Sequence, residues 1–169
     1  MAKSQPTQRT PFEHFHDGLL HVHRELQHGV ADILTVASHE NSNQAVANRM
    51  IAAFCEELEN HHRSEDVFFF PAFRAAGRLR STDIAFLDAR DDEHLVLVRL
   101  VGELKELTGR RSGTWAATAR RLLTEVAEVA DPHFAAEESV LTAEHVAEMI
   151  TQRQLANVYR DMGQNWDRR

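Results

Sequence analysis

The chain has 169 residues, of which 43% are hydrophobic and 27% are charged, and its formal net charge is -7. This length and balance are typical of one globular domain and exclude a chain that is disordered as a whole. The negative charge would repel phosphate backbones, so we expect no nucleic-acid partner. Because no apolar run is long enough to cross a membrane and the N-terminus has no apolar segment of the signal-peptide kind, we expect no membrane partner and a cytoplasmic location.

Residues 1–10 are polar, and we expect them to form a disordered arm. From about Pro11 to Ser38, apolar residues and histidines recur at spacings of four and three, which predicts one long helix with a single inward face. The residues of that face are Phe12, His16, Leu19, His23, Leu26, Val30, Ile33 and Ala37.

A second helix is predicted from about Ser42 to Ala75. Its inward face comprises Ile51, Phe54, Leu58, His61, Glu65, Phe68 and Ala72. Pro71 removes one backbone donor, so we expect a kink or fraying in the last turn.

A third helix is predicted from about Ser81 to Thr108, and a fourth up to about Thr142. The third helix would bury Ile84, Leu87, Asp91, His94, Val98 and Val101. The fourth would bury Ala119, Leu122, Val126, Val129, His133, Glu137 and Val140. Pro132 lies inside the fourth helix, so we expect either a kink or two separate segments.

Four long amphipathic segments joined by short turns, without a strand pattern, predict an all-α fold. We expect an up-down-up-down four-helix bundle over residues 11–142. Residues 143–169 would form a C-terminal extension, in which residues 151–162 can make a short extra helix.

A motif of histidine, three residues, glutamate and a second acid occurs twice, at His61 to Asp66 and at His133 to Glu138. In a helix, the histidine and the glutamate four residues later share one face. His23 precedes His61 by 38 residues and His94 precedes His133 by 39, so the chain reads as two copies of one helical hairpin. Equal spacings place six side chains at one depth of the bundle: His23, His61, Glu65, His94, His133 and Glu137.

Buried carboxylates cost several kcal/mol each unless something compensates their charge. The predicted inward faces hold no lysine or arginine, so a pair of cations is the simplest compensation. Six imidazole and carboxylate ligands are too many for one tetrahedral zinc and suit two bridged metal ions. Mixed nitrogen and oxygen donors without thiolate favour iron, with manganese as the second choice.

Residues 12–142 resemble the hemerythrin-like, or HHE cation-binding, domains. The likeness lies in the motif from His61 to Asp66 followed by Phe70-Pro71, in His94, and in the motif from His133 to Glu138. It implies a four-helix bundle with a non-haem di-iron centre, in which the six residues named above are the metal ligands and the two glutamates bridge the ions. His16 lies one heptad before His23 on the same face, and we prefer His23 because the repeat spacing selects it.

The sequence departs from the oxygen-carrying members, which have two histidines four residues apart on the third helix. Here Arg90 and Val98 flank His94 at that spacing. Either His62 supplies a further ligand, or the two iron sites differ in coordination. We therefore expect the protein to bind or turn over a small oxidant, namely peroxide, nitric oxide or O2, and the pattern does not decide whether it is an enzyme. The alternatives are an iron- or redox-sensing module that acts through a partner, and oxygen or iron binding or storage without turnover.

Several neighbours of these residues have two interpretations. Asp91 is a candidate acceptor for the His94 imidazole or an ordinary helix-start carboxylate. Asp66 and Glu138 are expected to face the surface or to pair with neighbouring helices. The cluster Phe68 to Phe70 cannot face one way only, so one of its rings is a candidate contact in a homodimer.

Overall fold

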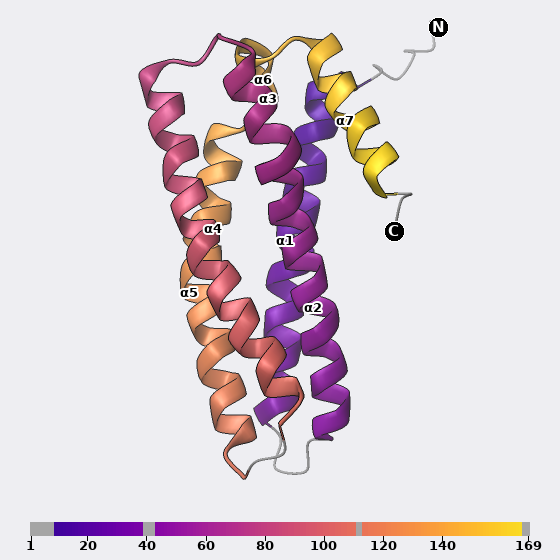
Figure 1. Ribbon diagram of the computed structural model, residues 1–169, viewed down its shortest axis with the longest axis vertical. Coiled ribbons are helices and arrows are strands. Elements are labelled where there is room, and N and C mark those ends of the chain that lie inside the picture. The colour runs from indigo at the N-terminus through magenta and orange to yellow at the C-terminus, as the bar shows by residue number, and fades with distance from the viewer. Residues whose placement is uncertain (1–8, 39–42, 111–112, 167–169) are drawn as a thin grey trace, which may run out of the picture.

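The computed structural model describes residues 9–38, 43–110 and 113–166. Four long helices form a bundle (Figure 1), namely α1 (Pro11–Ser38), α2 (Gln44–Ser64), α4 (Ser81–Thr108) and α5 (Trp115–Val140). They run in alternating directions, each packs against the next along the chain, and α1 packs against α5 to close the ring. The predicted all-α, up-down-up-down four-helix bundle is confirmed. Most of the predicted disordered arm, residues 1–8, lies outside the described residues.

The second predicted helix is interrupted before its end. A π-helical turn, η1 (Glu65–Phe69), separates α2 from the short helix α3 (Phe70–Ala75), and the Phe70 N–H bonds to the Glu65 carbonyl five residues earlier. The expected irregularity is present, but it precedes Pro71 rather than following it. Proline has no N–H to donate, which lowers the cost of widening the helix at this point.

The π turn changes which residues face the core. A wider turn holds about one extra residue, so the buried face moves on by one position. Phe69 and Phe73 are buried, whereas the predicted Phe68 and Ala72 are only half-buried. Phe68 packs at the margin of the protein's own core. The homodimer contact predicted for this cluster stays a prediction.

The inward face of α4 also differs from the prediction. Ile84 and Val98 are exposed and Asp91 is half-exposed, whereas Arg90 and Leu97 are buried. Four consecutive apolar residues at positions 95–98 allow two helical registers, and periodicity alone selected the wrong one. The expectation that no lysine or arginine lies on an inward face is therefore wrong.

Helix α5 runs without interruption through Pro132, which lies on its exposed side. The predicted alternative of two separate segments is therefore wrong. The buried face includes Ala130 and Phe134, while the predicted Val129 and Val140 are half-buried.

Two further helices follow the bundle, α6 (Ala143–Met149) and α7 (Gln152–Trp166). α7 contains the predicted short helix, and Thr151 and Gln154 form a reciprocal capping box at its start. Both helices pack on α1, and α7 also packs on η1 and α3 at one end of the bundle (Figure 1). The division predicted at residue 142 stays a prediction.

Buried apolar residues form two clusters along the bundle axis. One extends from Leu26 to Ala37 and Ala47, where α1 ends and α2 begins, and the other surrounds Phe73 and includes residues of α6 and α7. Between the two clusters lies a layer of buried polar side chains that all four long helices cross. Such a layer is costly unless its polar groups are paired or bind a ligand.

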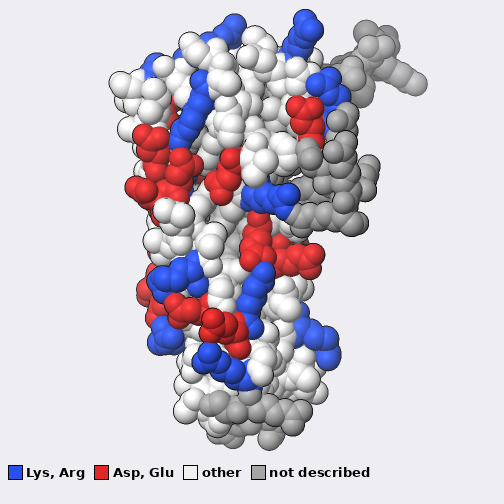
Figure 2. All heavy atoms as spheres, in the orientation of Figure 1, with Lys and Arg blue, Asp and Glu red and all other residues white. Residues whose placement is uncertain are grey.

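On the outside, acidic and basic side chains alternate over the face shown in Figure 2. None of the described helices is long and apolar enough to cross a membrane.

Candidate metal centre

The polar layer contains all six residues that the sequence singled out. Each is at most 8% exposed, and together they come from every long helix of the bundle. They are His23 on α1, His61 on α2, Glu65 on η1, His94 on α4, and His133 and Glu137 on α5. His16, the alternative to His23, lies outside the layer, where its Nδ1 is 3.0 Å from the Leu141 carbonyl oxygen.

The two glutamates lie between the histidines of the two hairpins. Glu65 places Oε1 3.6 Å from His61 Nε2 and Oε2 3.4 Å from His94 Nε2. Glu137 places Oε2 3.2 Å from His23 Nε2 and Oε1 3.3 Å from His133 Nε2. These contacts lack hydrogen-bond geometry, and all four carboxylate oxygens are buried without a hydrogen-bond partner.

The candidate ligand atoms form two groups that share both glutamates. One group consists of His23, His61 and the two carboxylates, and the other of His94, His133 and the same carboxylates. Within each group the ligand atoms lie within 4.8 Å of one another, a spacing that fits a metal ion. Each group takes both histidines of one hairpin and a carboxylate from each hairpin.

Carboxylates outside the layer bind the outer nitrogen of three of these imidazoles. The Nδ1 atom of His23 is 3.0 Å from Glu138, and that of His94 is 2.7 Å from Asp66. The second acid of each motif thus contacts the lone histidine of the other hairpin. An Nδ1–H that donates to a carboxylate leaves the Nε2 lone pair facing inward, as in histidine ligands of metals.

The third such acceptor, Glu93, is a residue that sequence reasoning missed. Its Oε2 is 2.7 Å from His133 Nδ1, and its Oε1 accepts a hydrogen bond from the buried guanidinium of Arg90 at 2.6 Å. Arg90 also donates a hydrogen bond to the His133 carbonyl. It thus contacts His133 directly through the backbone and indirectly through Glu93. Asp91, which the sequence offered either as an acceptor for His94 or as an ordinary helix-start carboxylate, pairs with Arg74. Because the prediction assigned the wrong helical register to α4, it placed Arg90 outside the buried face.

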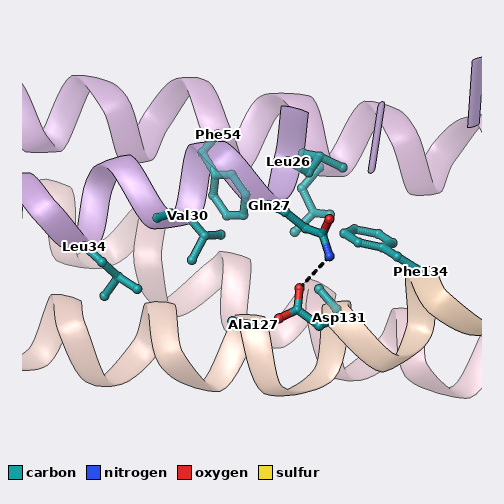
Figure 3. A pocket seen from close by; sticks show the side chains of 11 residues that line it. Leu26, Gln27, Val30, Leu34, Phe54, Ala127, Asp131 and Phe134 are labelled. Atoms are coloured by element: carbon teal, nitrogen blue, oxygen red, sulfur yellow. Dashed lines mark hydrogen bonds between the residues drawn. The ribbon is translucent and has the colours of Figure 1, made fainter. Parts of the chain in front are cut away.

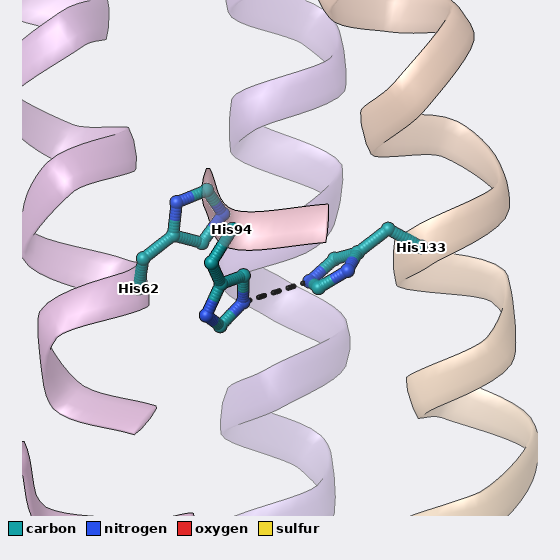
Figure 4. A group of neighbouring side chains, drawn as sticks. All are labelled: His62, His94 and His133. Carbon is teal, nitrogen blue, oxygen red and sulfur yellow. Dashed lines mark hydrogen bonds between the residues drawn. The ribbon is translucent and has the colours of Figure 1, made fainter. Parts of the chain in front are cut away.

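A seventh buried side chain, His62, adds a further imidazole to the second group. His62, His94 and His133 come from three helices and their rings face a common space (Figure 4). The His62 ring stacks on His94 at 4.3 Å between centroids, and its Nε2 is buried without a hydrogen-bond partner. This placement favours the first of the two predicted alternatives, in which His62 supplies a ligand.

The corresponding residue of the other hairpin is Phe134, as an overlay of the two motifs would have shown. Its ring stacks on His23 at 4.2 Å, just as His62 stacks on His94. The two groups therefore have the same plan, but only one includes a third imidazole.

The charges of the layer call for a cation. The Nε2 atoms of His94 and His133 approach to 3.2 Å, where two lone pairs repel unless a proton or a metal ion lies between them. Burial alone would lower the pKa of His94, but the carboxylates of Asp66 and Glu65 outweigh it and raise the pKa to about 10. Burial and the positive His94 lower the pKa of His133 to about 2. Without a metal, His94 therefore holds a proton and His133 stays neutral, at the place where an ion would fit.

Burial raises the pKa of both Glu65 and Glu137, and at Glu65 the neighbouring Glu137 raises it further. No lysine or arginine among the described residues pairs with either one, because the nearby Arg90 is bound to Glu93. Inward-facing imidazole nitrogens, unpartnered carboxylate oxygens and outer carboxylates on the histidines together fit a bound metal.

Fold and site together define a helical-bundle domain that binds metal cations. Residues 14–143 match the family described as the hemerythrin HHE cation-binding domain, and the chain belongs to that family. Neither the search of curated proteins nor the search of solved structures gave a match.

Because Glu137 is a buried carboxylate, we expect its replacement to have opposite effects on stability in the metal-free and in the iron-loaded protein. In the metal-free protein, Glu137→Gln should raise the free energy of unfolding by roughly 1 to 3 kcal/mol, because it removes a buried charge. With ferrous ion added anaerobically, the same variant should gain less stability than the wild type. Thermal unfolding with and without a chelator measures both effects.

Glu128→Gln, an exposed substitution on the same helix, is the matched control and should change neither state. A metal-free Glu137→Gln protein less stable than the wild type would contradict this electrostatic account.

Proposed function

We propose that this protein holds two non-haem iron ions in the polar layer and uses them to bind or turn over a small oxidant, namely peroxide, nitric oxide or O2. The proposed ligands are His23, His61, Glu65, His94, His133 and Glu137, with His62 as a seventh. Manganese is the second choice of metal. A cytoplasmic location stays a prediction.

One observation carries the proposal of a metal pair. Each glutamate presents one oxygen to a histidine of the first hairpin and the other oxygen to a histidine of the second. A carboxylate that faces two nitrogen donors in this way is placed to bridge two ions. A single ion would leave half of these oxygens buried and unpaired, at a cost of several kcal/mol.

The donor set supports iron. Neutral imidazoles and carboxylates, without any thiolate, are the ligands of the carboxylate-bridged metal pairs found in helical bundles. The lone cysteine, Cys55, lies in the apolar cluster below the layer and outside every candidate ligand group. Bound iron would supply the electron transfer that an oxidant requires.

The residues around the His23–His61 position and the His94–His133 position differ. Asp66, Glu93 and Glu138 orient three of the imidazoles and fix the tautomer that faces the metal. His62 gives one position three imidazoles, whereas Phe134 leaves the other with two. The position with fewer protein ligands is the one that can accept an external ligand.

The regulatory alternative receives less support from the fold. A sensor that unfolds a weak fourth helix needs a break at Pro132, and α5 is continuous there. A sensing role would still predict no turnover of peroxide, so kinetics separate the two functions.

The proposal is tested by loading the protein with iron anaerobically and measuring metal content and absorption. We expect about two irons per chain, and near-ultraviolet bands that change when azide, peroxide or oxygen is added. A Glu65→Ala, Glu137→Ala double variant should lose both. The proposal fails if the wild type binds no iron, or if the double variant keeps the bands.

The role of His62 has a separate test. His62→Phe copies the residue of the other hairpin, so the stack on His94 remains while the imidazole is lost. We expect the affinity for one of the two ions to fall by at least about tenfold. His16→Gln is the control and should bind both ions like the wild type. Equal affinities in the His62→Phe protein and the wild type would exclude His62 as a ligand.

A further inference from the structure

A cavity of about 190 Å³ leads from the surface to two of the proposed ligands, His61 and Glu65. Helices α1 and α7 and the segment around η1 form its wall. The wall side chains are mostly apolar: Phe15, Leu19, Val22, Phe69, Tyr159 and Met162. Val22 and Tyr159 are 38% and 43% exposed, whereas His61 and Glu65 are buried, so the cavity extends from the solvent to the polar layer.

The second hairpin closes the equivalent path. His94 follows Arg90 and Glu93 by four and one residues, and His23 follows Leu19 and Val22 by the same numbers. Arg90 and Glu93 form a salt bridge at 2.6 Å and bind both His133 Nδ1 and the His133 carbonyl. Leu19 and Val22 make no such bonds and instead line the cavity.

Helix α7 provides the outer part of the wall. The Tyr159 ring packs edge-on against Phe69, with centroids 5.7 Å apart, and Met162 lies one helical turn further along. Both residues lie beyond the segment 14–143 that matches the family. This part of the wall is therefore an addition to the metal-binding bundle.

Another cavity, of about 240 Å³, lies between α1, α2 and α5 (Figure 3). A hydrogen bond from Gln27 to Asp131 crosses it at 3.0 Å. Its lining includes Phe134, whose ring stacks on His23, and none of the proposed ligands. Of these two cavities, only the first is lined by proposed ligands.

We propose that the cavity under α7 is the route by which external ligands reach the His23–His61 position, and that Tyr159 and Met162 limit its width. This inference rests on the proposed function. The cavity is smaller than the roughly 300 Å³ at which sites for larger organic ligands begin. It therefore admits ligands of diatomic to peroxide size. It also reaches the position that has only two imidazoles, where an external ligand can bind.

Gly18 allows the route to be blocked without disturbing the fold. It lines the cavity, and a Cβ placed there would meet nothing within 4 Å. Gly18→Phe would fill the entrance, while Gly18→Ala adds only a methyl group and is the matched control. Both replace glycine within a helix, which does not lower helix stability. Tyr159→Ala should widen the same entrance.

The test is the rate at which nitric oxide binds to the reduced, iron-loaded protein, followed by stopped-flow absorption. Iron content and the spectrum before mixing should be the same in all variants. We expect Gly18→Phe to slow binding by at least about tenfold, Tyr159→Ala to accelerate it severalfold, and Gly18→Ala to match the wild type.

Equal rates in the wild type and in Gly18→Phe, with normal iron content, would overturn this route while leaving the proposed function intact. A wild-type protein that takes up no iron, or whose iron binds neither nitric oxide nor azide, peroxide or oxygen, would overturn the proposed function and this inference with it.

Discussion

Two glutamates without hydrogen-bond partners, buried between two apolar clusters, determine how this bundle is organised. Glu65 and Glu137 are at most 3% exposed, and none of their oxygens is paired within the described protein. Burying two such charges costs several kcal/mol each. The inward imidazoles and the carboxylates behind them have a consistent explanation only if cations occupy the space between the helices. The free energy of metal binding then contributes directly to the free energy of folding.

The duplicated hairpin explains both the likeness and the difference of the two candidate ligand groups. Each motif's second acid orients the lone histidine of the other hairpin, so neither half is complete alone. The symmetry fails where His62 in the first motif corresponds to Phe134 in the second, and where Arg90 and Glu93 on α4 correspond to the apolar pair Leu19 and Val22 on α1. Both differences act in the same direction. They add a third imidazole and a salt bridge to the His94–His133 group. The His23–His61 group has fewer candidate ligands and lies beside an apolar cavity.

Periodicity and the repeat were enough to predict the bundle and six of the residues in the polar layer, because matched spacings reflect matched depths in antiparallel helices. What they missed has local causes. The π turn at Glu65 adds a residue before Pro71 and shifts the following phenylalanines by one position, which no spacing rule anticipates. The apolar run in α4 allowed two registers, so Arg90 and Glu93 were overlooked. The cavity depends on how α7 packs against α1, which the sequence pattern does not specify.

The central claim is that two inequivalent irons share Glu65 and Glu137. The Mössbauer spectrum of the oxidised protein loaded with iron-57 tests this claim most directly. Two quadrupole doublets of equal area, without magnetic splitting at low temperature in a weak field, would show coupled irons in different environments, as this account predicts. A magnetically split spectrum of isolated high-spin ferric ions would contradict it.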